Sequence, residues 1–157
     1  MDVNKVMVSN VASCRHDTKL ESIALMMWDN DCGCIPVVDS ENKLIGIVTD
    51  RDIAMGAALQ HKPLWEMTAQ SICGEREVYC CKTRDDIHRA LKLMQVHEVR
   101  RLPVVDSQNK LVGIISMGDV LASAEPAKDA ALPLYELAAM LHAVSAHHTV
   151  PKLSASA

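Results

Sequence analysis

Two short segments of the chain carry residue types that could bind a phosphorylated sugar, and they share one pattern. They read GIVTDRD, from Gly46 to Asp52, and GIISMGD, from Gly113 to Asp119. The pattern is typical of a strand that runs into the start of a helix, where free backbone N–H groups and the helix dipole favour an anion. Both segments are therefore candidate phosphate-binding junctions.

The hydroxyl and the carboxylate of each segment suit a nucleoside phosphate. Thr49 or Ser116 can donate to a phosphate oxygen, and Asp52 or Asp119, three residues further on, can accept from both hydroxyls of a ribose. The same four residues could instead only cap the helices that follow. Because the pattern occurs twice, we favour a ligand site over capping alone.

The two segments belong to an internal repeat with a constant offset of 67 residues. The likeness is strongest between Cys34–Ile53 and Arg101–Val120, where eleven of twenty positions are identical. One structural unit has thus been used twice. Two units that each leave an apolar face unburied must pack on one another, and the cleft between them is the natural place for a ligand.

Each copy reads as strand, helix, strand, strand, helix, because β-branched runs flank the turn residues SENK and SQNK and a helical apolar pattern precedes them. We predict an α/β (α+β) fold with a first repeat at 1–60, a connector at 61–71, a second repeat at 72–123, and a C-terminal helix and tail at 124–157. The apolar face of that last helix is predicted at Leu134, Leu137, Ala138 and Leu141.

Composition narrows the function class. Hydrophobic residues make up 49% of the chain and charged residues 23%, with a net charge of -4, which argues against binding driven by nucleic-acid phosphates. No apolar stretch approaches the roughly 20 residues that span a bilayer, and the N-terminus lacks a signal-peptide pattern, so we expect a cytoplasmic protein. No nucleophile elbow, Walker loop or GxGxxG is present, so we do not expect an enzyme.

The repeated segments PVVD, LIGIVTDRDI, VRRLPVVD and LVGIISMGDV resemble the cystathionine β-synthase (CBS) domain family in tandem, the arrangement called a Bateman module, over roughly residues 6–121. The resemblance implies two β-α-β-β-α units that pair through their sheets and up to two clefts for adenosine-containing ligands, with AMP, ATP or NAD foremost. It also implies a stand-alone regulatory module, a homodimer formed through the helices, and an effector protein that receives the signal.

The resemblance also assigns roles to individual residues. Thr49 and Ser116 match the hydroxyl that contacts phosphate, and Asp52 and Asp119 match the carboxylate that binds ribose. Ile47 and Ile114 match the aliphatic residue beside the base, and the partner repeat completes each cleft, with Val11, Cys32 and Gly33 in one and Val78, Val99 and Arg100 in the other. Arg51, Arg100 and Arg101 are the best candidates to meet a phosphate chain, because a guanidinium can bind two oxygens at once, although they could instead form a solvated face.

The two copies differ where charge matters. Met117 and Gly118 stand where the first copy has Asp50 and Arg51, both candidate ligand-binding residues, so we expect unequal clefts. Where many family members carry a Thr that touches the base, this chain has Val8. Two other function classes stay open: an interaction module with vestigial clefts that acts through dimerisation or its C-terminal helix, and a thiol or metal sensor.

The metal hypothesis rests on Cys and His residues whose spacing fits a zinc site poorly, so we expect none. These residues are Cys32, Cys34, Cys80, Cys81, His142, His147 and His148.

Overall fold

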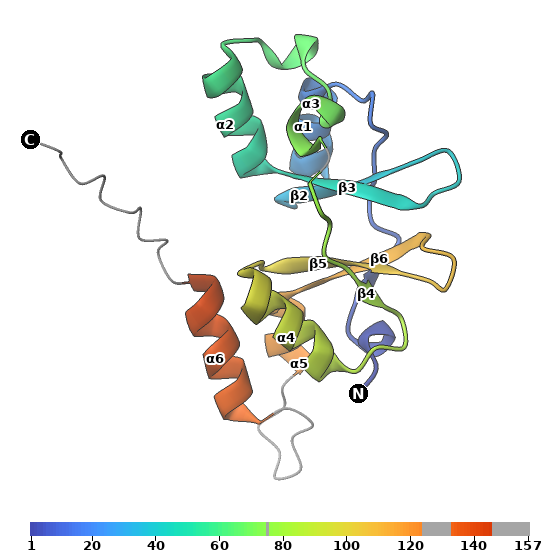
Figure 1. Ribbon diagram of the computed structural model, residues 1–157, viewed down its shortest axis with the longest axis vertical. Helices are drawn as coiled ribbons and strands as arrows, with labels where there is room; N and C mark the ends of the chain where they lie inside the picture. Colours follow the sequence, from blue (N-terminus) through green and yellow to red (C-terminus); the bar gives the residue numbers. More distant parts are fainter. Residues whose placement is uncertain (75, 124–132, 146–157) are drawn as a thin grey trace, which may run out of the picture.

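The computed structural model describes residues 1–74, 76–123 and 133–145, which form two lobes whose β-hairpins face each other (Figure 1). The first lobe contains α1 (Leu20–Asp29), β2 (Cys34–Val38), β3 (Leu44–Thr49), α2 (Asp50–Gln60), η2 (Leu64–Glu66) and α3 (Ala69–Cys73). The second contains η1 (Val3–Lys5), β1 (Val8–Ser9), β4 (Cys81–Lys82), α4 (Ile87–His97), β5 (Arg101–Val105), β6 (Leu111–Ser116), α5 (Met117–Ser123) and α6 (Leu134–Ser145). The predicted mixed α/β fold of two similar repeats and a C-terminal helix is confirmed.

The two hairpins are built alike because their turn chemistry is alike. β2 pairs with β3 from Cys34 opposite Thr49, and β5 pairs with β6 from Arg101 opposite Ser116, both antiparallel. At each turn one aspartate, Asp39 or Asp106, accepts from two backbone N–H groups through Oδ1. An asparagine follows in the left-handed region at φ 64° or 63°, which asparagine tolerates better than most residues.

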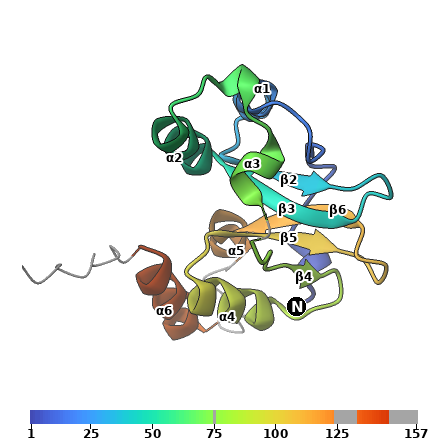
Figure 2. The same ribbon diagram turned by 45° about the horizontal axis from the view of Figure 1, so that its top comes forward.

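The lobes meet through these hairpins in a pseudo-symmetric seam. The N–H of Leu44 donates to the carbonyl of Asn109 at 3.0 Å, and the N–H of Leu111 donates to the carbonyl of Asn42 at 2.9 Å. Val38 and Val105 join Leu44 and Leu111 in a buried apolar cluster beside these bonds. Packing of the repeats through their sheets, as predicted, follows from this seam (Figure 2).

Each lobe also includes residues from outside the range predicted for its repeat. β1 pairs with β6 through Val8 opposite Ile114, and Val3 is fully buried in the core of the second lobe. In return, Met67 and Ala69 from the connector lie in the core of the first lobe, where the N–H of Leu20 donates to the carbonyl of Met67 at 3.1 Å. The predicted connector is therefore folded and completes the first lobe.

The C-terminal helix α6 lies beside α4 on the outer face of the second lobe (Figure 1). It buries Leu137, Met140 and Val144, whereas Leu134 is 81% exposed. The predicted apolar face is therefore wrong in part, because packing on α4 selects the stripe at spacings of three and four residues that begins at Leu137. His88 on α4 contacts Glu136 on α6 through a hydrogen bond.

The sequence predicts Asp17 or Thr18 as the cap of the first long helix and Thr83 or Asp85 as the cap of its counterpart, but the observed helix starts differ. α1 begins after Lys19 without a side-chain cap, and the hydroxyl of Thr18 instead accepts from the N–H of Arg15. α4 is capped by Asp86, whose carboxylate accepts from the N–H of His88 at 2.9 Å. Within the described parts of the chain, no helix is long and apolar enough to cross a membrane.

Candidate functional site

Both predicted junctions lie at the end of a hairpin and at the start of a helix. The carboxylate Oδ2 of Asp52 accepts from the N–H and the hydroxyl of Thr49, at 3.0 and 2.7 Å. The carboxylate Oδ2 of Asp119 accepts from the same groups of Ser116, at 2.7 and 2.6 Å. In return, each hydroxyl accepts from the aspartate N–H. The capping role is thus present in both copies, and in each it leaves the second carboxylate oxygen, Oδ1, for another partner.

The two Oδ1 atoms have different surroundings. Oδ1 of Asp52 accepts from Nη1 of Arg76 at 3.1 Å, in an ion pair that sequence reasoning did not anticipate. Among the described residues, Oδ1 of Asp119 has no hydrogen-bond partner. The carboxylate of the second junction is therefore the one that is available to a ligand.

Asp119 lines a cavity of about 390 Å³ between the lobes, which we call cleft A. Its walls come from both repeats and include six of the predicted site residues: Val11, Cys32, Arg101, Ile114, Ser116 and Asp119. Val8, Asn10, Ala12, Asn30, Asp31, Cys34 and Pro36 complete the lining. The structure thus brings these six residues, from both repeats, around one cavity.

A second hollow of about 580 Å³ adjoins cleft A, because Asp31, Cys32 and Arg101 line both. It runs between α1 and α2 and includes the predicted residues Gly33 and Asp50. A Cβ built on Gly33 would lie 3.1 Å from a carboxylate oxygen of Asp50 and 3.7 Å from Nη2 of Arg101. Glycine at this position therefore lets a carboxylate and a guanidinium approach the strand at the edge of cleft A.

Arg101 is the only one of the three predicted phosphate partners that lines a described hollow. The guanidinium of Arg51 is exposed and makes no hydrogen bond or ion pair with any described residue. Nε of Arg100 donates to the carbonyl of Val144, in the last turn of α6, at 3.2 Å. The sequence could not predict which arginine would line a cavity, because the partners of each side chain depend on where α6 packs and on the orientation of β5.

The other predicted residues lie around the pseudo-symmetric counterpart of cleft A, which we call cleft B. Ile47 and Thr49 are half-buried at the end of β3, and Val78 packs against the seam between the hairpins. Val99 packs against the core of the second lobe. Between α4 and the segment that leads into β4, the rings of Tyr79 and His97 stack with centroids 3.5 Å apart and planes 15° apart, a pair that sequence reasoning missed.

The six cysteines are free thiols, and four of them are buried. Burial raises the pKa of Cys14 and of Cys81 to about 12, and it raises the pKa of Cys34 to about 11 although nearby Arg101 opposes the change. In the described part of the chain, no three His, Cys, Asp or Glu side chains lie where they could hold a metal ion together. His147 and His148 lie outside the described residues.

Two curated relatives are similar to this chain in sequence. The CBS domain-containing protein YhcV of Bacillus subtilis is 35% identical over 118 residues, which cover 75% of this chain and 81% of YhcV. Inosine-5'-monophosphate dehydrogenase of Methanocaldococcus jannaschii is 38% identical over 105 residues, which cover 67% of this chain. The chain spans only 20% of that dehydrogenase.

Solved structures share the fold. CBSX2 in complex with AMP has a TM-score of 0.69 at 22% identity and covers 78% of this chain and 95% of its own. The CBS domain pair of MJ0100, in complex with 5'-methylthioadenosine and S-adenosyl-L-methionine, has a TM-score of 0.69 at 24% identity and covers 78% of this chain and 98% of its own. Hypoxic Response Protein I with two coordinated zinc ions has a TM-score of 0.72 at 26% identity and covers 85% of this chain and 100% of its own.

The model of one protein family, the CBS domain, matches residues 3–57 and 71–125 of this chain. The two matched segments contain both junctions and together cover more than half of the sequence. This chain therefore belongs to the CBS domain family as a tandem pair.

Proposed function

We propose that this chain is a regulatory module that binds one adenosine-containing ligand in cleft A and passes its occupancy to an effector protein. The observation that carries the proposal is Asp119, which lines a cavity between the repeats and whose Oδ1 has no partner among the described residues. Because this oxygen is not buried, incoming hydroxyl donors can reach it, and hydrogen bonds to a charged acceptor are stronger than those to a neutral one.

The lining of cleft A suits the three parts of a nucleotide. Asp119 can accept from the ribose hydroxyls, Ile114 offers an apolar surface to the base, and the guanidinium of Arg101 can meet two phosphate oxygens at once. A volume of about 390 Å³ lies in the range of small-molecule sites. The AMP bound to CBSX2 and the adenosyl ligands bound to MJ0100 support this ligand class.

Charge offers a way to rank the adenosyl ligands. Cleft A combines the cation of Arg101 with the carboxylates of Asp31 and Asp119. Asp119 is committed to the ribose in this proposal, so Arg101 favours a phosphate and Asp31 favours a cationic group such as a sulfonium. Because Arg101 also lines the adjoining hollow, where a phosphate chain would extend, we propose a nucleotide of the AMP, ADP, ATP or NAD type as the ligand.

Calorimetric titration of the whole chain tests this proposal. We expect AMP to release or absorb measurable heat with a micromolar to millimolar dissociation constant, and S-adenosylmethionine to bind more weakly. The matched variant Arg101→Gln should weaken AMP more than it weakens adenosine, which lacks the phosphate. Absence of binding by every adenosine ligand up to millimolar concentration would refute the proposal, and mass spectrometry of small molecules released from purified protein would then name another ligand.

We further propose that the chain forms a homodimer through α1 and α2. Large apolar side chains are exposed on these helices, with Leu25 and Trp28 of α1 at 59 and 83% and Leu59 of α2 at 74%, and Trp65 of the following η2 is 61% exposed. In the second lobe, α6 packs on α4 and covers part of the corresponding face, although Val96, Leu134 and Tyr135 remain exposed there. Sedimentation of Trp28→Glu beside the wild-type chain tests it, since a dimer built on this face should dissociate.

This face is also the observation that favours the second function class, an interaction module with vestigial clefts. The two classes separate in the titration, because an interaction module would dimerise without binding any adenosine ligand. The thiol or metal sensor has less support, since the pKa values of the buried thiols are raised. Elemental analysis of untagged protein would detect a bound metal. We keep a cytoplasmic, non-enzymatic protein as part of the proposal.

A further inference from the structure

The pseudo-symmetry gives each residue of cleft A a counterpart 67 positions away in the sequence. The matching registers of the two hairpins show that these counterparts occupy equivalent places in the fold. We define cleft B by the counterparts of the cleft A lining that fall within the described residues: Glu77, Val78, Tyr79, His97, Glu98, Val99, Arg101, Pro103, Cys34, Ile47, Thr49 and Asp52. Differences between the two sets show what each cleft can accept.

The largest difference in side-chain size between the two sets is at two positions, where cleft A has an alanine and an asparagine and cleft B has two aromatic rings. Ala12 and Asn30 form part of its wall. Their counterparts in cleft B are Tyr79 and His97, whose rings are half-buried and stack 3.5 Å apart. This spacing leaves no room for a third ring between them, so an aromatic pair fills space that in cleft A is part of the cavity.

The carboxylate of cleft B is also engaged. Oδ1 of Asp52 accepts from Arg76 at 3.1 Å, whereas the equivalent oxygen of Asp119 has no partner in the described chain. Arg76 is the counterpart of Ser9, whose short side chain could not reach as far. The guanidinium of Arg76 therefore takes up the acceptor that ribose hydroxyls would need.

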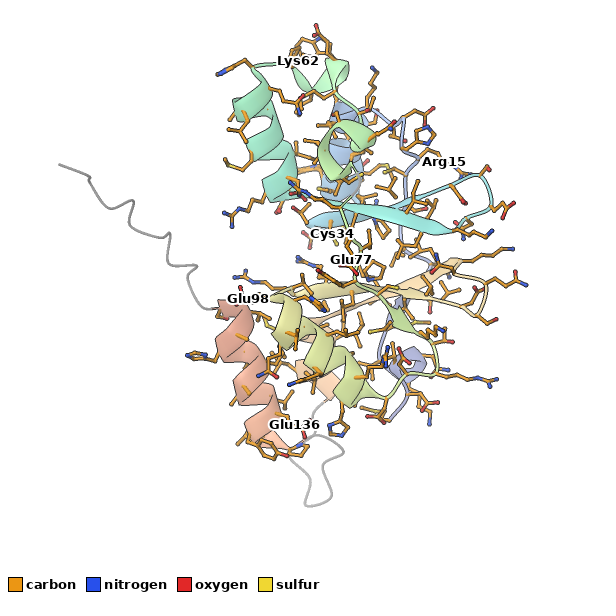
Figure 3. The ribbon with its side chains drawn as sticks, in the orientation of Figure 1. Arg15, Cys34, Lys62, Glu77, Glu98 and Glu136 are labelled. Atoms are coloured by element: carbon orange, nitrogen blue, oxygen red, sulfur yellow. The ribbon has the colours of Figure 1, made fainter. Side chains whose placement is uncertain are left out.

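The charges around cleft B disfavour a phosphate. Glu77, the counterpart of Asn10, lies between the two lobes, where its exposed side chain adds a carboxylate (Figure 3). Cys34 and Arg101 are each other's counterparts and belong to both sets, so they do not distinguish the clefts. The difference in charge is therefore the carboxylate of Glu77 in cleft B, where cleft A has the amide of Asn10.

We propose that cleft B is closed by the chain's own side chains, with the Tyr79–His97 ring pair in the place of a base and Arg76 in the place of ribose hydroxyls. Each chain then binds one ligand, in cleft A alone. This inference rests on the proposed function and adds its stoichiometry. The ring pair is the main obstacle, because the side chain of Arg76 is 69% exposed and a solvated ion pair of this kind opens readily.

The decisive experiment replaces the three obstacles by the residues that the first repeat carries at the same positions. The variant Arg76→Ser, Tyr79→Ala, His97→Asn is titrated with AMP beside the wild-type chain, and circular dichroism confirms that both are folded. We expect one AMP per wild-type chain and two per variant chain. Adding Asp119→Asn to the triple variant should weaken one of the two sites and thereby assign the new site to cleft B.

The outcomes separate this inference from the proposed function. If the wild-type chain binds no AMP and the triple variant binds one, binding in cleft A is refuted, whereas the proposal that side chains close cleft B still stands. Two AMP on the wild-type chain, or a folded triple variant that binds no more AMP than the wild type, would overturn the closure.

NMR spectra of the wild-type protein test the closure of cleft B even if the triple variant does not fold. In the free wild-type protein, stacking on Tyr79 should shift the His97 ring protons upfield in the NMR spectrum, and Tyr79→Ala should abolish that shift. Addition of AMP to the wild-type protein should leave it in place. An absent upfield shift, or its loss when AMP is added, would show that the ring pair does not close the cleft.

Discussion

Replacing Asp119 by Asn tests the residue on which the ligand site depends. In the structure, Oδ2 of Asp119 accepts from the N–H and the hydroxyl of Ser116, while Oδ1 is available in cleft A. An asparagine keeps one oxygen, which can still accept from Ser116, but it turns an N–H₂ donor toward the ligand. Two donors would then face each other where a ribose hydroxyl had bonded to a carboxylate.

The expected loss follows from that one bond. A hydrogen bond to a charged group contributes about 1.5–3 kcal/mol net. Because 1.4 kcal/mol corresponds to about a tenfold change in affinity, the dissociation constant for AMP should rise between about tenfold and about 150-fold in Asp119→Asn. Isothermal titration at a temperature where the variant is folded measures this directly.

Asp52→Asn is the matched control. Asp52 has the same capping bonds to Thr49, so both variants should lose comparable stability, about 1 kcal/mol each, in urea denaturation. Asp52 is paired with Arg76, so its replacement should change the AMP affinity at least tenfold less than Asp119→Asn does. Equal losses of affinity in the two variants, or a loss below about threefold in folded Asp119→Asn, would refute the reasoning from the Oδ1 atoms.

Three further predictions concern stability and thiol chemistry. The hydrogen bond from His88 holds the pKa of Glu136 below its usual range. The stabilisation of α6 by this bond should therefore be present above about pH 4.5 and be lost as the pH falls through the lowered pKa. In urea titrations, Glu136→Gln should differ in stability from the wild type only above the pH range in which Glu136 titrates. Gly113→Ala would place a Cβ 2.6 Å from the carbonyl of Val8 and should cost about 1–3 kcal/mol, whereas Gly118→Ala, with 3.5 Å to its nearest atom, should be neutral or stabilising. Equal urea midpoints for the two alanine variants would contradict this. The buried thiols should react with iodoacetamide at pH 8 far more slowly in the native than in the urea-unfolded chain, and mass spectrometry that found equal rates would show that burial does not protect them. These thiols are Cys14, Cys34 and Cys81.

Local patterns predicted most of the fold. The β-branched runs and the Asp and Asn turn residues specify each hairpin through bonds between near neighbours, and the structure reproduces both hairpins in the same register. The hydroxyl and carboxylate of each junction likewise act within three residues, so their capping bonds could be anticipated. Helix starts were less accurate, because candidates such as Thr18 and Asp17 were equally good caps on local grounds.

The candidate site could be predicted only in part. Repeat-equivalent positions identified Ser116 and Asp119 as well as Thr49 and Asp52, but they could not tell which pair faces an open cavity. Arg100 and Arg101 are neighbours of the same residue type, yet one bonds to the end of α6 and the other lines cleft A. The signal for the difference was present in the sequence, since Ala12 and Asn30 align with Tyr79 and His97, but its meaning depends on which side chains meet.

The sequence by itself determined that one unit occurs twice, that each unit contains a hairpin and a capped helix, and that a hydroxyl and a carboxylate end each hairpin. These properties depend on short-range bonding that any chain with this pattern would make. Only the tertiary structure decided that β1 joins the second lobe, that α6 covers one helical face, and that Arg76 reaches Asp52 across 24 residues. Such contacts join segments that are distant in the chain, so they depend on how the lobes pack.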